Sequence, residues 1–239
     1  MMVEAARQET ITNNLANSET IGFKRDLALQ RAQAELPVLR VGDSSPLPVQ
    51  PVIGTLGTGS LVAGIHTVHE QGVLRETGRE LDLAMAGPGF FTVETAQGLR
   101  FTRSGAFTLD ADGFLLTDAG HRVMGTEGYL QIPAGELTVD NDGGLFVDGA
   151  PVGQLRLVAF AEQELLSKQG ESLFDAGGQA ALPVAAQVQQ GFLESANVQI
   201  IQEMVKMIAT QRAYETNQRA LQAQDELLGK AVNEIGSLR

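Results

Sequence analysis

The chain lacks residues on which much protein chemistry depends. None of its 239 residues is cysteine or tryptophan, and only three are histidine. The absence of cysteine excludes disulfide bonds, thiolate metal ligands and cysteine nucleophiles. So few histidines also leave little material for metal binding or general-base catalysis. These absences argue against an enzyme and against a metal or cofactor site.

Positive charge and long apolar runs are also scarce. The 17 basic residues against 29 acidic ones give a net charge of −12, which repels phosphate backbones, so we expect no nucleic-acid partner. No stretch approaches the roughly 20 apolar residues that span a bilayer, so we expect no membrane insertion. The first ten residues include Glu4, Arg7 and Glu9 and lack the apolar core of a secretory signal. We therefore expect a chain that is either cytoplasmic or exported without a cleaved signal.

The first segment, residues 1–35, predicts helical structure. We expect a helix from Met1 to the run of asparagines that ends at Asn17, because asparagine tolerates the left-handed backbone of a helix end. The composition also allows a second short helix from Lys24 to Glu35. Gly22, which lies between the two, is expected to supply a turn.

The composition changes twice over the next part of the chain. Residues 36–70 are punctuated by proline and glycine, which predicts a linker or an extended arm. Residues 71–190 predict a β-rich domain of short antiparallel strands, because Asp-Gly pairs recur there between apolar or alternating segments. Asp-Gly is a strong short-range hairpin signal. The pairs are Asp112-Gly113, Asp142-Gly143 and Asp148-Gly149.

The last segment, residues 191–239, predicts one long helix. Asn197 is expected to cap its N-terminus, and no proline or glycine follows until Gly229. Apolar residues recur at alternating steps of four and three, which is a heptad seam with eight of eleven positions apolar. Those eight are Ile200, Met204, Met207, Tyr214, Leu221, Leu228, Val232 and Ile235.

A helix of this length needs partner helices to cover its seam. The N-terminal helix offers Ile11 and Leu15, so we expect the two ends to pack as an α-helical coiled-coil stalk. The expected fold is mixed α and β, with an antiparallel β-rich central domain inserted between the N- and C-terminal helices. A helical hairpin within one chain would use the same seam, whereas the seam's length and polar positions favour packing between chains as well.

Several motifs resemble catalytic or binding sites, but ordinary structure explains them better. His66 and His69 would share a face of a helix, but the valine and isoleucine around them favour a strand, in which they point to opposite faces. Asp110 and Asp140 open acidic segments that lack the glycine and glutamate positions of a calcium loop, so hairpin turns explain both. Ser104 lacks the leading glycine of a nucleophile elbow. No catalytic constellation emerges, so we expect no catalytic, metal or cofactor-binding residues.

Several motifs spread over the chain belong together. They are residues 13–17 (NNLAN), 20–25 (TIGFKR), 81–85 (LDLAM), 87–91 (GPGFF), 101–107 (FTRSGAF), 191–198 (GFLESANV), 203–208 (EMVKMI) and 211–215 (QRAYE). In this combination they closely resemble the signatures of the bacterial flagellar basal-body rod and hook axial protein family. By total length and by the single β domain, the chain is most similar to the distal rod proteins.

The resemblance implies a structural subunit of the basal-body rod, which self-assembles through its terminal helices into a helical tube and transmits torque to the hook. The implied partners are copies of the same chain, other rod and hook proteins, and the export apparatus. Type III export without a cleaved signal peptide would deliver the chain to the basal body. The expected assembly interface comprises Ile11, Asn14, Leu15, Asn17, Gly22, Phe23 and the eight seam residues of the C-terminal helix.

Family members carry further residues before the position that matches Met1, so we expect a shortened N-terminal helix. The main alternative function is a secreted, oligomeric glycan-binding module with a coiled-coil stalk. A third hypothesis is a hydrolase that uses paired carboxylates. The motifs at both ends favour the rod subunit over the glycan-binding module, and the lack of a catalytic constellation weighs against the hydrolase.

Overall fold

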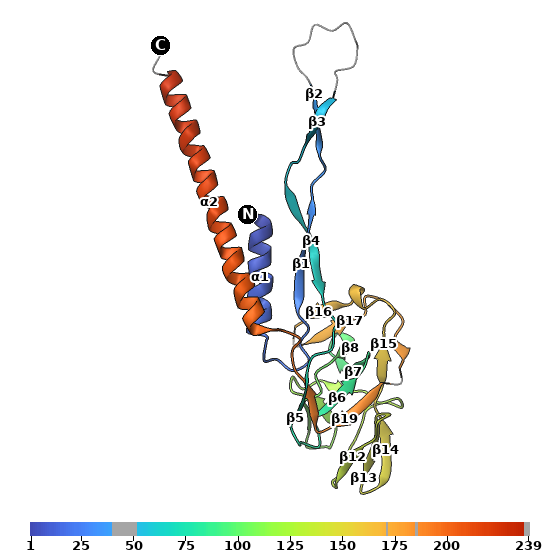
Figure 1. The fold of residues 1–239 in the computed structure, drawn as a ribbon. Coiled ribbons are helices and arrows are strands. Elements are labelled where there is room, and N and C mark those ends of the chain that lie inside the picture. Colours follow the sequence, from blue (N-terminus) through green and yellow to red (C-terminus); the bar gives the residue numbers. More distant parts are fainter. Residues whose placement is uncertain (40–51, 171, 185, 237–239) are drawn as a thin grey trace. The chain divides into compact units, whose positions relative to one another are not determined.

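The computed structural model describes residues 1–39, 52–170, 172–184 and 186–236. The chain forms two compact units, and it crosses between them four times, so each unit is built from segments that are distant in sequence (Figure 1). Unit 1 contains Met1–Thr12, Leu27–His66 and Met204–Arg239, and unit 2 contains Asn13–Asp26 and Thr67–Glu203.

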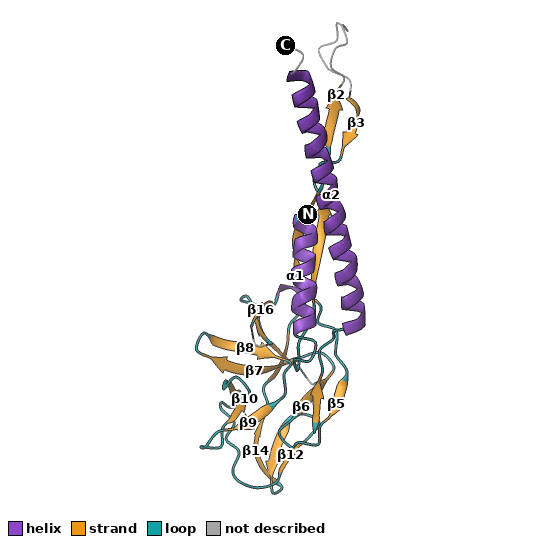
Figure 2. Cartoon of the chain, turned by 90° about the vertical axis from the view of Figure 1, so that its left-hand side faces the viewer, coloured by secondary structure: helices purple, strands orange, loops and turns teal. Residues whose placement is uncertain are grey.

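Two α-helices lie at the ends of the described chain, and strands make up most of the regular structure between them (Figure 2). The helices are α1 (Met2–Ala16) and α2 (Ile200–Gly236), and a single 3₁₀ turn spans Gln163–Leu165. The predicted coiled-coil stalk is wrong. Over the residues that the structure describes, the fold is mostly β, and its terminal helices do not form a coiled coil that flanks a β domain.

Helix length and side-chain exposure explain why no coiled coil forms. α1 has 15 residues and α2 has 37, so most of α2 has no helix of the same chain that could run opposite it. The seam residues Leu221, Leu228 and Val232 are exposed, whereas knobs-into-holes packing would bury them. The heptad pattern therefore describes an apolar face of α2 and not a partner within the chain.

A strand replaces the helix that composition allows from Lys24 to Glu35. β1 (Asp26–Ala32) covers most of that range and pairs with β4 (Ser60–Thr67). Pairing with a strand that is distant in sequence satisfies the backbone and overrides helix-compatible composition. The second predicted helix is therefore wrong.

The described parts of the segment 36–70 contain a further pair of strands. β2 (Leu36–Leu39) pairs antiparallel with β3 (Val52–Leu56), with Leu36 opposite Leu56. Most side chains of both strands are exposed, so backbone hydrogen bonds hold the pair. Residues 40–51 lie outside the described residues.

Unit 2 contains a nine-stranded sheet. Its main path runs β16-β17-β8-β7-β11-β10-β9, while β15 pairs with β7 and β18 pairs with β15. Every pairing described in this sheet is antiparallel, as the sequence predicts. The strands are β7 (Phe90–Thr95), β8 (Gly98–Thr102), β9 (Phe107–Leu109), β10 (Leu115–Thr117), β11 (Arg122–Val123), β15 (Leu157–Ala159), β16 (Ser167–Gln169), β17 (Leu173–Asp175) and β18 (Leu182–Pro183).

Smaller antiparallel sheets complete unit 2. One has the order β12-β13-β14, and two others pair β6 with β19 and β5 with β20. The last two pairings bring the segment before α2 back onto the beginning of the β-rich region. The strands are β5 (Leu74–Glu76), β6 (Leu83–Ala86), β12 (Leu137–Val139), β13 (Gly144–Val147), β14 (Ala150–Gln154), β19 (Gln187–Gln190) and β20 (Phe192–Glu194).

The three Asp-Gly pairs form hairpin turns, which confirms their prediction. Gly113 lies between the paired strands β9 and β10, and Gly143 between β12 and β13; both have positive φ. Asp148 and Gly149 both have positive φ and alone connect β13 to β14, as a two-residue type I′ turn requires.

The acidic segments that superficially resemble calcium loops stabilise two of these turns. Asp110 Oδ1 accepts hydrogen bonds from the N–H groups of Asp112 at 3.0 Å and Phe114 at 2.8 Å. Asp140 Oδ1 likewise accepts hydrogen bonds from the N–H groups of Asp142 at 3.1 Å and Gly144 at 2.7 Å. An aspartate that bonds its own turn in this way explains the pattern without a metal ion.

Two apolar clusters form the core of unit 2. The larger one joins the nine-stranded sheet to the three-stranded sheet and includes Phe91 and Phe107, whose rings meet edge to face at 5.2 Å. The smaller one includes Phe90, Phe160 and Phe174 on the other part of the sheet.

Candidate functional site: assembly interface and buried clamp

The structure separates the expected interface residues into exposed and buried groups. On α2 the exposed ones are Ile200, Met204, Leu221, Leu228 and Val232, while Met207 and Tyr214 are half-buried and the side chain of Ile235 lies outside the described part. At the N-terminal end Ile11, Asn14, Gly22 and Phe23 are buried, and Leu15 and Asn17 are half-buried. The buried group therefore packs within the single chain, whereas most of the α2 group is exposed on it.

Three further apolar residues near the start of α2 were not predicted as interface residues. Ile201, Val205 and Ile208 are all more than half exposed. Steps of four and three place them on one face of the helix, beside the predicted seam. That spacing is the sequence signal that identifies them.

Gly22 forms a tight turn after α1. Its φ is +68°, and its N–H donates to the carbonyl oxygen of Glu194 at 2.8 Å. A Cβ atom here would lie 2.3 Å from the backbone nitrogen of Ser104 and 2.5 Å from the carbonyl carbon of Arg103. Backbone conformation and space both require glycine, so the turn seats the N-terminal motif directly on two other segments of unit 2.

We expect Gly22→Ala to lower the free energy of unfolding of unit 2 by about 2–5 kcal/mol, because a left-handed alanine costs about 1–2 kcal/mol and overpacking about 1–3 kcal/mol. Urea unfolding of the purified chain measures the change. Gly78→Ala is the matched control, since Gly78 has φ +70° but no atom within 4 Å of the added Cβ. If the two variants lose the same free energy of unfolding, the close approach of Gly22 to Arg103 and Ser104 is not what requires glycine there.

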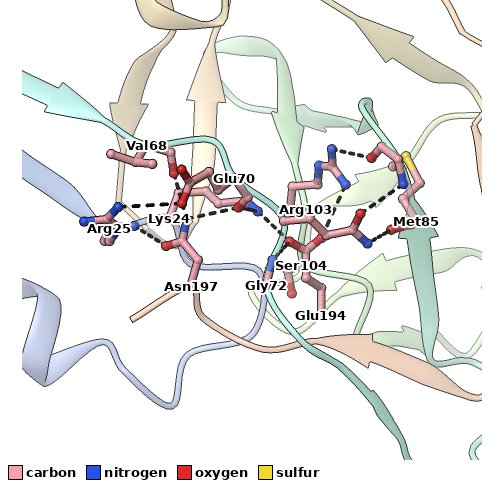
Figure 3. Close-up of polar contacts among 12 residues, drawn as sticks. Lys24, Arg25, Val68, Glu70, Gly72, Met85, Arg103, Ser104, Glu194 and Asn197 are labelled. Carbon is pink, nitrogen blue, oxygen red and sulfur yellow. Dashed lines mark hydrogen bonds and ion pairs between the residues drawn. The ribbon is translucent and has the colours of Figure 1, made fainter. Parts of the chain in front are cut away.

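A buried clamp of three charged residues lies beside this turn (Figure 3). We define the clamp as Lys24, Arg103 and Glu194. Lys24 Nζ lies 2.5 Å from Glu194 Oε1, and an Arg103 guanidinium nitrogen lies 3.3 Å from Glu194 Oε2. All three side chains are at most 4% exposed. One carboxylate thus joins the segment after α1, the segment after β8 and the end of β20.

Backbone groups add further hydrogen bonds to the clamp. The N–H of Gly72 donates to Glu194 Oε1 at 2.8 Å, and Lys24 Nζ donates to the carbonyl oxygen of Glu70 at 2.6 Å. Arg103 donates to the carbonyl oxygen of Gly87 at 2.8 Å. The clamp therefore also fixes the segments around residues 70–72 and 87, which are far from its three members in sequence.

The charge balance makes Glu194 the central member of the clamp. Burial lowers the pKa of the Lys24 ammonium, and the attraction and hydrogen bond of Glu194 oppose that lowering. Burial likewise lowers the pKa of the Arg103 guanidinium, again against the opposing effect of Glu194. Both cations thus depend on the same carboxylate for the compensation that a buried charge needs.

Asn197 does not cap α2, so that prediction is wrong. The helix begins at Ile200, and the side chain of Asn197 reaches back to the N-terminal motif instead. Its Oδ1 accepts from the N–H of Arg25 at 2.7 Å, and its Nδ2 donates to the carbonyl oxygens of Val68 at 2.8 Å and Glu70 at 3.0 Å (Figure 3). The amide therefore joins two backbone segments, one at Arg25 and the other at Val68 to Glu70.

The polar residues of this region are committed to holding segments together. Among the described residues, no group of three or more histidines, aspartates or glutamates is placed to hold a metal ion. No helix in the described part of the chain is long and apolar enough to cross a membrane. His69 packs against the rings of Phe90 and Phe174. A β-rich body in which a buried clamp joins the segment after α1 to the segment before α2, together with a long helix that exposes apolar residues, is typical of a structural subunit.

Comparison with known proteins agrees with this class. Three family models match: "Flagella basal body rod protein" over residues 1–24, "Flagellar hook protein FlgE/F/G D1 domain" over 84–147, and "Flagellar basal body rod FlgEFG protein C-terminal" over 189–234. Each match contributes one member of the clamp, namely Lys24, Arg103 and Glu194. The clamp therefore joins the three segments by which the family is recognised.

Curated relatives match over almost the whole chain. The flagellar basal-body rod protein FlgG of Buchnera aphidicola is 32% identical over 236 residues, covering 92% of this chain and 90% of the relative. FlgF of Caulobacter vibrioides is 34% identical over 235 residues, covering 96% and 92%. FlgG of Bacillus subtilis is 30% identical over 242 residues, covering 94% and 92%.

The chain belongs to the flagellar basal-body rod protein family, as its motifs predict. It is a structural protein of the rod, located in the basal body of the bacterial flagellum. The comparisons do not support the alternative of a glycan-binding module.

Proposed function

We propose that the chain polymerises through the exposed apolar face of α2 into the helical tube of the rod, and that this tube transmits torque to the hook. One observation carries the proposal, namely that apolar residues remain exposed at the start of the 37-residue helix α2, from Ile200 to Ile208, and again from Leu221 to Val232. We call them the α2 face. It consists of Ile200, Ile201, Met204, Val205, Ile208, Leu221, Leu227, Leu228 and Val232.

Physical chemistry supports burial of the α2 face in the assembled rod. Burying one such side chain stabilises an interface by about 1.5–3 kcal/mol. Long helices gain most of their stability from packing rather than from intrinsic propensity. In a rod every subunit can supply the surface that covers its neighbour's helix. Copies of this chain and other rod and hook proteins are therefore the partners that we propose.

Two further parts of the proposal follow from the family resemblance. Delivery to the basal body would depend on the flagellar export apparatus and not on a cleaved signal peptide. The chain would have no enzymatic activity of its own, because its contribution is mechanical. Both parts are expectations for this chain.

Electron microscopy of the concentrated, purified protein tests the proposal. We expect helical tubes or fibres from the wild-type chain and none from Val205→Asp, which places a carboxylate on the α2 face at a side chain that is 61% exposed in the single chain. Gln202→Asp, at an exposed polar position one turn away, is the matched control and should polymerise. Discrete oligomers from the wild-type chain, or tubes from Val205→Asp, would contradict the proposal.

A further inference from the structure

The chain leaves unit 2 at four points, and a residue beside each point belongs to one hydrogen-bonded cluster. The chain passes between the units at residues 12/13, 26/27, 66/67 and 203/204. We name as the anchor cluster the residues Asn14, Asp26, Thr67, Glu203 and Lys168, all of which belong to unit 2. The first four lie at the crossings, and Lys168 comes from β16 in the nine-stranded sheet.

Asp26 is the centre of the anchor cluster. Its N–H donates to Asn14 Oδ1 and its carbonyl oxygen accepts from Asn14 Nδ2, both at 2.8 Å. The side-chain amide of Asn14 thus bonds both backbone groups of Asp26, as a paired strand would. Asp26 Oδ1 accepts from the Thr67 hydroxyl at 2.7 Å. Asn14 Nδ2 also lies 3.5 Å from Glu203 Oε2. These bonds connect all four crossings through two side chains, Asn14 and Asp26.

Lys168 joins this arrangement to the sheet. Its Nζ donates to Asp26 Oδ2 at 3.0 Å and to the carbonyl oxygen of Lys24 at 2.7 Å, and it lies 3.5 Å from the centre of the Phe23 ring. The side chains of Lys168 and Asp26 are only 18% and 15% exposed. Burial lowers the pKa of Lys168, and Asp26 opposes that lowering. Such a shielded pair is screened less by salt than a surface pair.

We propose that Lys168 is a positioning residue, which through Asp26 fixes to the β body the four points where the chain leaves unit 2. Force that enters unit 2 through any of its four connections then reaches the sheet without local opening of the segment 23–26. This role rests on the proposed transmission of torque by the rod. Lys168, Asp26 and Thr67 all lie outside the three segments that match family models.

Hydrogen exchange of the purified monomer tests the anchor directly. Lys168→Met removes the charge but keeps an apolar stem over Phe23. The backbone amide of Asp26, which donates to Asn14, should then exchange about tenfold faster or more. The variant lacks the charge-assisted hydrogen bond to Asp26 that opposes local opening of this segment. Amides in the pair β7 and β8 should exchange as before. Ser167→Ala, an exposed neighbour on the same strand, is the control and should change neither.

Two further variants keep the test decisive. Lys168→Arg retains the charge and can stack on an aromatic ring, so it should restore most of the protection at Asp26. Asp26→Asn should accelerate exchange like Lys168→Met, and the double variant should add little to either single one. Unchanged exchange at Asp26 in Lys168→Met, or independent additive effects, would overturn the proposal.

A cellular experiment separates this inference from the proposed function. In the Lys168→Met strain, isolated basal bodies should contain rods in normal numbers, while swimming in viscous medium is impaired. Normal swimming under load would overturn the anchor role, and so would loss of the rods, which would place Lys168 in assembly. The monomer exchange result does not depend on polymerisation, so failure of the proposed function would leave it intact.

Discussion

Replacing Leu228 by aspartate is expected to abolish rod assembly and motility while leaving the isolated chain folded. Leu228 is 64% exposed and belongs to the α2 face, so the single chain does not need it for packing. Between subunits, the change removes about 1.5–3 kcal/mol of apolar burial and adds the cost of an unpaired buried carboxylate. Because a polymer repeats each contact, the loss recurs at every subunit. Swimming assays and electron microscopy of isolated basal bodies measure the outcome.

Gln222→Asp is the matched control for Leu228→Asp. Gln222 is exposed on the same part of α2 and directly follows the seam residue Leu221. Its replacement by aspartate adds the same charge as Leu228→Asp, but at a polar position. We expect normal rods in this strain. Rods and swimming that are normal in Leu228→Asp as well would show that the α2 face is not an assembly contact.

Replacing Glu194 by glutamine is expected to cause a large loss of stability in unit 2. Glutamine has the same shape and can still accept the hydrogen bond from Gly72, but Lys24 and Arg103 lose the carboxylate that both contact. Removing one partner of a buried ion pair costs about 3–5 kcal/mol. Since about 1 kcal/mol corresponds to roughly 2–4 °C in a protein of this size, we expect a melting temperature lower by about 6–20 °C.

Glu70→Gln isolates the effect of burial in the Glu194 experiment. The Glu70 carboxylate is 74% exposed and lies 3.6 Å from Arg25, so its ion pair is of the surface kind, worth about 0–1 kcal/mol. The hydrogen bond from the clamp to Glu70 goes to its backbone oxygen, which the substitution keeps, and the attraction of the Glu70 carboxylate on Lys24 is weaker than that of Glu194. Circular dichroism melts of the two variants give the comparison. A melting temperature of Glu194→Gln within a degree or two of that of Glu70→Gln would refute a stabilising role for the clamp.

Local signals in the sequence predict the local structure well. The Asp-Gly pairs locate three hairpin turns because their backbone preference acts within two residues, whatever the rest of the chain does. Gly22 is recognisable as a turn residue for the same reason, although its close approach to Ser104 depends on a segment that lies some 80 residues away in sequence. Turn chemistry at Asp110 and Asp140 likewise follows from residues immediately around them.

Long-range pairing accounts for the errors and omissions. β1 has a composition that allows a helix, but β4 supplies a strand partner that no local pattern reveals. The heptad seam of α2 predicts an apolar face but cannot tell whether the partner lies in the same chain, and the prediction of an internal coiled coil failed on that point. From the sequence alone, Asn197 suits a helix cap, because only the fold shows that its side chain bonds the backbone of Arg25 and Val68 instead.

The clamp could be found from the sequence only in part. Glu194 is the one charged residue in the motif GFLESAN, and Lys24 directly follows the apolar part of TIGFKR, which suggests that each has a specific partner. Their contact with each other and with Arg103 cannot be predicted without the fold, because Lys24 and Glu194 are 170 residues apart in sequence. In the anchor cluster, Asn14 and Glu203 belong to such motifs, whereas Asp26, Thr67 and Lys168 do not.

A single introduced cysteine tests the central claim that the α2 face is buried between subunits. The chain has no cysteine of its own, so Leu228→Cys carries one thiol, whose reaction with a maleimide can be followed in the monomer, in isolated rods and in denatured rods. Provided that this milder change still permits assembly, we predict rapid labelling of the monomer and of denatured rods, and strong protection in intact rods. Labelling of intact rods as rapid as that of the monomer would contradict the account.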